Sequence, residues 1–446
     1  MVDPLFATDA MRSLFAPRAT LARMLDVEAA LARAEGACGV IPADAARAIT
    51  DACATLDVDA ATLVHAARES GNYAIPLVAA LTRHVDAAAR GYVHWGATSQ
   101  DVIDTGRVLQ LRDALAMLAN ELAGLDAALA TQARRHRDTP LAGRTWLQQA
   151  LPVTLGLKLA TALAAARRQA ARLARVRSEV AVLQFGGAVG TLASLGADAA
   201  AVERALAAEL DLAVPELPWH TQRDRLVDVA TMLGSLIATL GKVARDVALL
   251  AQTEVAEAFE PAAPGRGGSS TLPHKRNPVA SSIALAAAVR APGLVATMLA
   301  AAVQEHERGL GNWPAEWDVL PELCELAAGA LAAMRAVVEG LDVDAAQMRA
   351  NLAVTHGQIL AEAVQMALAP SIGRGDAHAL VAGIGKAAAA RGVALGEALK
   401  NDARVTRWLD GAAIDRLMDP AHYLGMAGEF VDRALAVKPH DPSHDC

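Results

Sequence analysis

Long stretches of the chain carry apolar residues at helical spacing. Between residues 226 and 250 they recur three or four positions apart, which places them on one face of an α-helix. They are Leu226, Val229, Leu233, Leu236, Leu240, Val243, Val247 and Leu250. No series of alternating apolar and polar residues, the mark of a half-buried strand, stands out beside them. The pattern therefore predicts an all-α protein.

Proline placement allows several of these helices to be long. A proline inside a helix breaks or kinks it. Three windows contain no proline: 77–139, 219–260 and 322–369. A helix of about 30 residues spans about 45 Å. We therefore expect an elongated bundle whose apolar faces extend to neighbouring chains.

Length and charge narrow the classes of function. The 446 residues are enough for two or three domains. A formal net charge of -8 provides no basic field, so neither nucleic acid nor an anionic membrane is expected as a partner. The most apolar run, 281–303, is interrupted by Arg290 and Pro292. We interpret it as a buried bundle helix rather than a membrane span.

Cysteine usage and the first residues favour the cytoplasm. The four cysteines lack the spacing of a metal site or a disulfide framework. They are Cys38, Cys53, Cys324 and Cys446. The stretch MVDPLFATDAMRSLF has charges and a proline where a secretory signal would carry its apolar run. The sequence thus predicts a cytoplasmic protein held together by packing.

The most distinctive polar segment is GGSSTLPHKRNP, at 267–278. Asn277, followed by a proline, predicts an N-cap and a first helical residue. Lys275 would then lie at a helix N-terminus, whose N–H groups and dipole favour an anion. Ser269 and Ser270 lie upstream in a glycine-containing loop that could close over a bound carboxylate. An ordinary loop followed by a capped helix fits this pattern equally well.

A second polar segment is HWGATSQDVIDT, at 94–105. Thr98 or Ser99 can cap a helix that begins near Asp101, so hydroxyl groups and free N–H groups gather at its start. Taken alone, the segment is also explained by a simple helix cap.

Two more segments are rich in polar side chains. In GRTWLQQALPVTLG, at 143–156, four of them precede what we expect to be another helix: Arg144, Thr145, Gln148 and Gln149. QEHERGLGNWPAEWD, at 304–318, is dense in charge. Its His306 has no second histidine at metal-binding spacing, so we predict a polar contact or an interface role for it rather than metal binding.

Together these segments resemble the conserved regions of the fumarase, aspartase, argininosuccinate lyase and adenylosuccinate lyase superfamily. GSSTLPHKRNP, from Gly268 to Pro278, matches the superfamily signature GSSxxPxKxNP. ATSQDVIDT resembles the first conserved region and GRTWLQQA the second. The resemblance implies an all-helical subunit that forms a homotetramer around a twenty-helix core. It also implies that three subunits contribute to each active site, and that no metal or organic cofactor is used.

The resemblance further implies three domains. Residues 1–100 would form an N-terminal helical domain. Residues 101–341 would form a central domain of long helices that carries the catalytic loop 261–278. Residues 342–446 would form a C-terminal helical domain.

Roles for individual residues also follow from the resemblance. Superfamily members remove a proton beside a carboxylate, and the resulting aci-carboxylate expels a group from the next carbon. Ser269 matches the base, and Lys275 and Asn277 match groups that stabilise the intermediate. The predicted substrate-binding residues are His94, Thr98, Ser99, Thr145, Trp146, Gln148, Ser270 and Arg308.

Trp146 departs from part of the superfamily. Adenylosuccinate and argininosuccinate lyases have a histidine there that acts as the general acid, and indole cannot replace it. A leaving carboxylate, with a pKa of about 4, needs no protonation. Trp146 therefore predicts lactone chemistry, in which a substrate carboxylate adds across a double bond of the same molecule. Ser269 would deliver the proton in that direction.

The cycloisomerase branch of the superfamily has this pattern. The chain resembles that branch further in GNYAIPLVAAL, LQFGGAVGTLASLG, PWHTQRDR and EHERGLGNWPAEWD. The implied substrate is a small tricarboxylate. One alternative is an adenylosuccinate-type lyase, because His94 matches a histidine of those enzymes. Another is a catalytically silent structural relative, against which the retention of Ser269, Lys275 and Asn277 argues.

Overall fold

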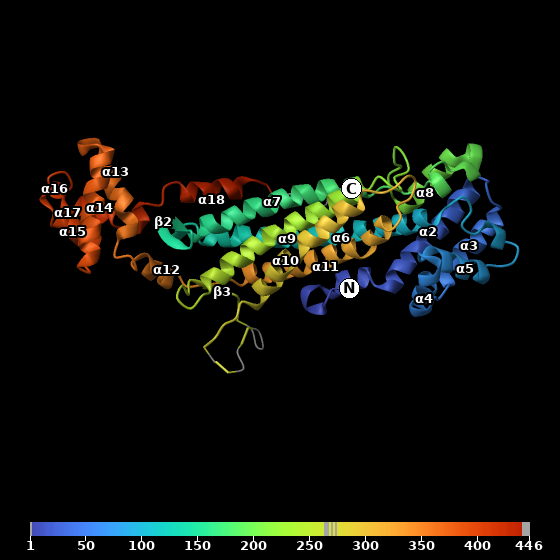
Figure 1. Ribbon diagram of the computed structural model, residues 1–446, viewed down its shortest axis with the longest axis horizontal. Coiled ribbons are helices and arrows are strands. Elements are labelled where there is room, and N and C mark those ends of the chain that lie inside the picture. The colour runs from blue at the N-terminus through green and yellow to red at the C-terminus, as the bar shows by residue number, and fades with distance from the viewer. Residues whose placement is uncertain (1, 263–266, 269–270, 273, 439–446) are drawn as a thin grey trace.

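The computed structural model describes residues 2–262, 267–268, 271–272 and 274–438, which form an elongated, mostly helical molecule (Figure 1). The predicted all-α class is confirmed. Long helices run side by side through the middle of the molecule. They are α6 (Ser99–Arg135), α7 (Leu155–Val180), α9 (Asp224–Leu250), α10 (Val279–Ala301) and α11 (Asn312–Glu339).

Helix α9 illustrates why these segments form helices and pack as they do. Every residue of its predicted apolar stripe is buried. Gly241 faces α10 so closely that a side-chain carbon added at this glycine would lie 2.6 Å from Cβ of Ala288. The apolar face of α9 and the small residues at its contact with α10 together hold the two helices against each other.

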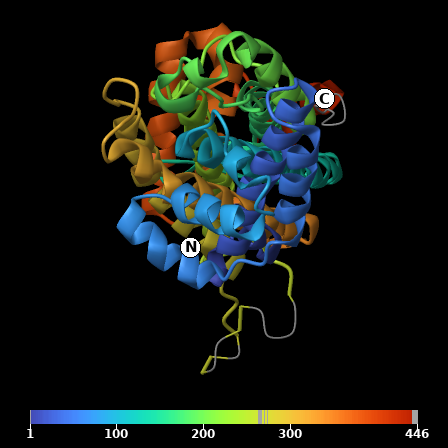
Figure 2. The same cartoon turned by 90° about the vertical axis from the view of Figure 1, so that its right-hand side faces the viewer.

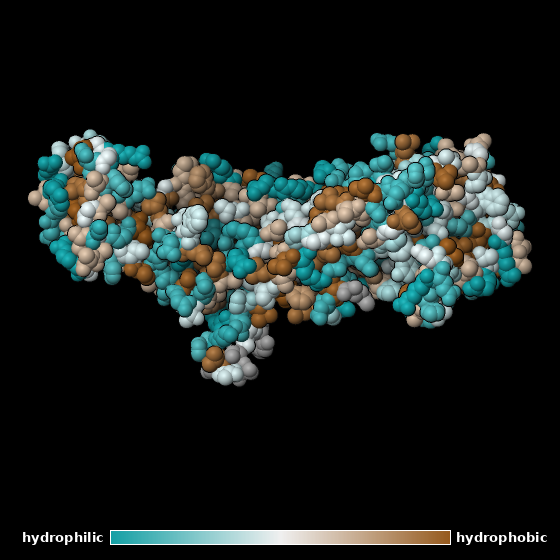
Figure 3. Space-filling view, viewed as in Figure 1, coloured by the Kyte–Doolittle hydropathy of each residue, from teal (hydrophilic) through white to brown (hydrophobic). Residues whose placement is uncertain are grey.

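Helix α10 differs from the expectation of a fully buried bundle helix. Its buried residues are mainly alanines, whereas Val289 and Leu299 are 79% and 51% exposed. Pro292 lies inside the helix without ending it. Helix α10 packs against α9 and α11 through these small residues together with Met298 and Val295, while Val289 and Leu299 stay largely exposed in one chain. Figure 3 shows apolar side chains along this middle part of the molecule.

By length and composition alone, α6, α9 and α10 would each be able to cross a membrane. In the most apolar window of α9, 56% of the residues are buried inside the protein, compared with 22% in that of α10. The apolar character of α9 is thus largely explained by packing within the chain. That of α10 is explained by packing within the chain to a much smaller extent.

The two ends of the molecule carry shorter helices. One end, which faces the viewer in Figure 2, holds the N-terminal helices and α8. These are α2 (Pro17–Ala37), α3 (Ala43–Thr55), α4 (Ala60–Ser70), α5 (Ala74–His84) and α8 (Ala199–Leu210). Helix α1 (Asp9–Leu14) precedes them and contacts α11 along the bundle. Most of their buried side chains belong to the same hydrophobic core as the long helices.

The opposite end holds helices from the last hundred residues, with a separate hydrophobic core. The helices of this core are α13 (Ala361–Ile372), α14 (Arg374–Ala390), α15 (Leu395–Lys400), α16 (Ala403–Thr406) and α17 (Gly411–Leu417). Helix α12 (Ala345–Leu352) precedes them, and its buried Met348 belongs to the core of the long helices. Helix α18 (Ala427–Ala436) then returns along the bundle and packs against α7. The three domain boundaries given above remain predictions.

Short strands occur where the sequence pattern did not indicate them. β1 (Pro140–Thr145) and β2 (Gln148–Thr154) form an antiparallel hairpin, and β3 (Ala258–Phe259) pairs with β4 (Asp342–Val343). The segment before α7 is therefore a hairpin rather than a plain lead into a helix. Its strands are too short and too mixed in polarity to give a clear alternating pattern.

Candidate active site

The start of α6 is organised around the buried carboxylate of Asp101. The amide of Thr98, the N-cap residue of the helix, donates to Asp101 Oδ2 over 3.0 Å. The amides of Gly186 and Gly187 and Nε2 of His220 also contact this carboxylate, at 2.7 to 3.0 Å. The predicted helix start near Asp101 is thus confirmed. The carboxylate fixes two other chain segments, at 186–187 and at 220, relative to Thr98 and Ser99.

His94 lies beside this helix start and contacts a buried acid. Its Nδ1 atom lies 2.6 Å from Oε1 of Glu28, which is 1% exposed. Burial lowers the pKa of His94, but the charge and hydrogen bond of Glu28 and the charge of Asp101 outweigh it, so the pKa is raised above its ordinary value. His94 also has a positive φ of 58°, which is unusual for a residue other than glycine. The contact thus favours a protonated imidazole.

Arg308 joins the same region. Its Nε atom donates to Oε1 of Gln100 over 3.1 Å, and its Nη2 atom donates to the carbonyl of Ala188 over 3.2 Å. The side chain of Gln100 in turn donates to the carbonyl of His220. An exposed cation thus lies near the helix start.

A buried ion-pair network supports this end of the bundle. Arg223 donates to both Asp104 and Glu316, with its closest contacts at 2.7 and 2.6 Å. Nε1 of Trp313 also donates to Asp104. Burial lowers the pKa of Arg223, but the two carboxylates raise it above its usual range. The sequence segments around 98, 186, 220 and 308 therefore meet at one place.

The β1–β2 hairpin presents a second group of predicted residues. Its turn is formed by Trp146 and Leu147, with φ values of 53° and 64°. Two consecutive positive φ values define a turn that glycine and asparagine prefer, so these bulky residues hold a strained backbone. Trp146 is 98% exposed and Leu147 74% exposed. Thr145 and Gln148, which flank the turn, are exposed as well.

The base of the hairpin is fixed by a buried ion pair. Arg144 donates to both oxygens of Glu257, at 2.8 and 2.7 Å, and Glu257 is completely buried. Thr145 lines an open groove of about 410 Å³ together with Lys158 and Lys242. Burial lowers the pKa of Lys158. The groove therefore offers cationic groups beside a predicted substrate-binding residue.

The signature segment is described in part. Ser269 and Ser270 lie outside the described residues. Lys275 is exposed, and it lines a cavity of about 220 Å³ with Asn277 and Gly268. The amide of Asn277 donates to the carbonyl of Gly267 over 2.8 Å. Lys275 and Asn277 are thus next to the same cavity.

The helix N-terminus beside these residues differs from the prediction. Helix α10 begins at Val279, so Asn277 is not its N-cap residue. The carboxylate of Glu260 accepts the amides of Ala280 and Ser281, at 3.0 and 2.7 Å. The first-turn amides are therefore already bound by a protein carboxylate, and this helix start does not offer them to a substrate.

The predicted residues are divided between the two ends of the bundle. His94, Thr98 and Arg308 lie near the start of α6 and α9, whereas Thr145 and Asn277 lie near their far ends. The 37 residues of α6 span about 55 Å at 1.5 Å per residue. One chain therefore does not bring all the predicted residues together.

Several contacts in these places were not predicted from the sequence. Glu28 is one buried acid in a helix rich in apolar residues, and Glu260 follows a short strand. Lys158 and Lys242 look like solvated helix residues in the sequence. Asp101 and His220 could have been identified as site residues from the sequence, because both lie in segments that resemble conserved regions of the superfamily. Within the described part of the chain, no group of three histidine, cysteine or acidic side chains is placed to hold a metal.

Comparisons with known proteins agree with the fold. Residues 5–293 match a family model described as lyase, and residues 357–434 match one described as adenylosuccinate lyase C-terminus. The chain therefore belongs to the lyase family of the fumarase/aspartase superfamily, which confirms the resemblance stated above.

Individual relatives are similar over the full length. The chain is 57% identical to a 3-carboxy-cis,cis-muconate cycloisomerase of Pseudomonas aeruginosa, over 98% of this chain and 96% of that protein. The crystal structure of a 3-carboxy-cis,cis-muconate lactonizing enzyme from Pseudomonas putida shares 50% identity and a TM-score of 0.92, covering 97% of each chain. A nitrosuccinate lyase of Streptomyces davaonensis is 42% identical, over 98% of this chain and 94% of that one.

Proposed function

We propose that the protein is a cycloisomerase that interconverts 3-carboxy-cis,cis-muconate and 4-carboxymuconolactone. The observation that carries the proposal is the 57% identity, over nearly the whole chain, to a relative named for this substrate. The reaction belongs to protocatechuate degradation by the β-ketoadipate pathway. A small tricarboxylate is a suitable partner for the cationic groups Arg308, Lys158 and Lys275.

The proposed chemistry passes through an aci-carboxylate. In the lactonising direction a substrate carboxylate oxygen forms a C–O bond to one carbon of a double bond, and the electron pair moves to the carbon beside another carboxylate. Ser269 then delivers a proton to that carbon, and in reverse it removes the same proton. Lys275 and Asn277 would stabilise the negative charge, and both line the cavity next to Gly268.

Trp146 fits a reaction without a general acid at its position. The ring-opening direction expels a carboxylate, which leaves without protonation. The hairpin turn holds the indole outward at 98% exposure. We propose that Trp146 forms an apolar wall for the lactone ring, with Thr145 and Gln148 beside it as binding residues.

The proposed assembly is a homotetramer with shared active sites. Two observations support it. The outward apolar face of α10 needs a covering surface, with Val289 and Leu299 largely exposed in one chain. The predicted site residues also lie at opposite ends of helices as long as α6. Antiparallel packing of subunits would bring the start of α6 from one chain to the hairpin and loop of others.

A second candidate is an adenylosuccinate-type lyase that releases fumarate. The match of residues 357–434 to the adenylosuccinate lyase C-terminus and the charged pair of His94 and Glu28 favour it. Trp146 argues against it, because a leaving amine needs a proton donor there. A catalytically silent relative is the third possibility.

One assay separates the three. The purified protein is supplied with 3-carboxy-cis,cis-muconate, whose ultraviolet absorbance is lost on lactonisation, and separately with adenylosuccinate, from which fumarate is measured. We expect loss of muconate and no fumarate. Fumarate release alone would establish the lyase, and no turnover of either compound would overturn the proposal.

The role of Ser269 is tested in the same assay. Ser269→Ala should lower turnover by roughly two or more orders of magnitude, as loss of a proton-transfer group does. Ser282→Ala is a matched control, because Ser282 is exposed on α10 and its hydroxyl only donates to the carbonyl of Val279. Equal rates for the two variants would remove Ser269 from the mechanism.

A further inference from the structure

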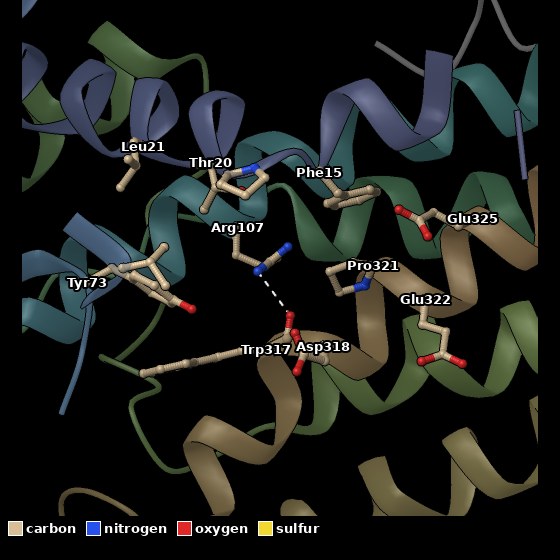
Figure 4. Close-up of a pocket in the computed structure, with 12 residues that line it drawn as sticks. Phe15, Thr20, Leu21, Tyr73, Arg107, Trp317, Asp318, Pro321, Glu322 and Glu325 are labelled. Atoms are coloured by element: carbon tan, nitrogen blue, oxygen red, sulfur yellow. Dashed lines mark hydrogen bonds between the residues drawn. The ribbon is translucent and has the colours of Figure 1, made fainter. Parts of the chain in front are cut away.

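The open groove of about 410 Å³ between the β1–β2 hairpin, the start of α7 and α9 has a cationic lining. Arg144, Lys158 and Lys242 contribute to it, and no acidic side chain is among the described residues of its wall. The cavity beside α6 and α11 has the opposite character, because three acidic side chains of α11 line it together with Arg107 (Figure 4). The groove at the hairpin is therefore the better place for an anion.

Lys158 differs from the other two cations of the groove in its partners. Arg144 donates to both oxygens of the buried Glu257. Lys242 pairs with Asp246 one turn further along α9. Within the described part of the chain, the ammonium group of Lys158 makes neither a hydrogen bond nor an ion pair, although the side chain is half-buried. Its positive charge is thus available to a ligand in the groove.

The position of Lys158 is unfavourable for the folded protein alone. It is the fourth residue of α7, which begins at Leu155, so its charge lies at the positive end of the helix dipole. Burial is the main cause of the lowered pKa of Lys158, and the charge of Asp246 offsets it only in part. The like charges of Lys242 and Arg144 lower the pKa further. A bound anion would relieve both the repulsion and the loss of solvation.

The rest of the groove suits the carbon skeleton of a small acid. Thr145, a predicted substrate-binding residue, lines it next to the hairpin turn that carries Trp146. Apolar side chains form much of the remaining wall: Ala150, Leu151, Val153 and Leu157. A molecule held at Lys158 by a carboxylate could therefore extend along the apolar strand toward Thr145.

We propose that Lys158 binds one carboxylate of the substrate and makes the protein prefer three carboxylates to two. This inference rests on the proposed function, in which Arg308 and Lys275 are the cations for other parts of the substrate. A dicarboxylate leaves the charge of Lys158 half-buried and without an anion, so it lacks the gain that the third carboxylate provides. That carboxylate takes no part in bond making, so the contact is equally strong before and during the reaction.

Two unreactive acids are the probes for Lys158. Propane-1,2,3-tricarboxylate carries three carboxylates, and glutarate is the same chain without the central one. Their binding to the full chain is measured by calorimetry. Lys158→Met removes the charge and keeps much of the length, whereas Lys158→Arg keeps the charge. Lys386→Met is the matched control, because Lys386 is an exposed lysine on α14.

We expect the unchanged protein to bind the tricarboxylate more tightly than glutarate. Lys158→Met should weaken tricarboxylate binding by about tenfold or more, as loss of a charged hydrogen bond does, and should leave glutarate binding unchanged. Lys158→Arg should retain part of the preference, and Lys386→Met all of it. Urea unfolding of Lys158→Met should show equal or higher stability, because a half-buried charge is removed. A lysine that only supported the fold would give lower stability and equal losses for both probes.

Turnover separates this inference from the function on which it rests. In the ultraviolet assay, Lys158→Met should raise KM for 3-carboxy-cis,cis-muconate with a smaller change in kcat. The inference is wrong if the tricarboxylate does not bind at millimolar concentration, is not preferred to glutarate, or binds Lys158→Met as tightly as the unchanged protein. Turnover of the muconate with any of these results would leave the cycloisomerase and remove Lys158 from it. Binding that depends on Lys158 without turnover would leave the carboxylate site and overturn the cycloisomerase.

Discussion

Nδ1 of His94 lies 2.6 Å from Oε1 of Glu28, a carboxylate that is only 1% exposed. The two residues are 66 positions apart, so the contact ties helix α2 to the segment that leads into α6. Without Glu28, burial would favour the neutral imidazole. Glu28 therefore sets both the orientation and the charge of a predicted substrate-binding residue.

Glu28→Gln should lower the pKa of His94, because the negative charge is lost while the size of the side chain is kept. A histidine whose pKa is raised by folding contributes stability that is complete below the unfolded value of 6.5 and lost as pH rises through the folded value. The variant should therefore lose about 1 to 3 kcal/mol of unfolding free energy at pH 5.5 and less at pH 9. Urea unfolding at the two pH values measures this. An equal loss at both would show that the charge of His94 is not involved.

Glu35 provides a second pH-dependent test on the same helix. Burial, with a smaller contribution from the charge of Glu28, raises its pKa to about 8, and neither oxygen has a hydrogen-bond partner among the described residues. The unfolded chain releases this proton near pH 4.5 and the folded one only near pH 8. The contribution of Glu35 to stability therefore falls as pH rises through that window.

Glu35→Gln should remove this loss. We expect a gain on the order of 1 to 3 kcal/mol in unfolding free energy at pH 8 and little change at pH 4.5. Urea unfolding of the variant and of the unchanged protein at the two pH values measures it. A destabilised Glu35→Gln at pH 8 would mean that the buried carboxylate has a partner that stabilises its charge.

The helices were predictable from the sequence because their information is local. The apolar stripe of α9 and the start of α6 at Thr98 depend on residues within a few turns of each other, and both predictions are confirmed. The outward face of α10 was not predictable in the same way. Its apolar residues indicate burial, but not whether the covering surface belongs to the same chain.

The site contacts were harder to predict because they join distant residues. Glu260 accepts amides 20 and 21 positions away, which displaces Asn277 from the predicted cap. Likewise, Asp101 meets His220 119 positions further on. Motif resemblance indicated which segments matter, while the partner of each side chain depends on the packing of the long helices.

Shared active sites predict complementation between inactive chains. A Ser269→Ala chain and an Arg308→Ala chain, each inactive alone, should regain activity when they are mixed, unfolded and reassembled. If the two segments of one site come from different chains, about a quarter of the sites in an equal mixture would receive both intact segments. Turnover of the mixture, with native mass spectrometry to confirm mixed tetramers, measures this.

The control mixes Ser269→Ala with Lys275→Ala. Both changes lie in one segment, so no site receives an intact loop and activity should not return. Recovery in this control, or no recovery with Arg308→Ala in confirmed mixed tetramers, would contradict the shared site.

Trp146→His tests why an indole stands at the hairpin turn. Histidine tolerates a positive φ better than most bulky residues, and the side chain is 98% exposed in one chain, so the variant should fold. If the expelled carboxylate needs no proton and the lactone ring rests against the indole, histidine removes apolar contact and adds a group that must be desolvated.

We expect turnover of 3-carboxy-cis,cis-muconate by Trp146→His to fall roughly tenfold or more, with Trp146→Phe retaining more activity because it keeps an apolar ring. The measurement is the ultraviolet assay between pH 5.5 and 8.5. Faster lactonisation by Trp146→His, with a rate that titrates at about pH 6.5 as a new histidine would, would show that a proton donor limits the reaction and that the apolar-wall explanation is wrong.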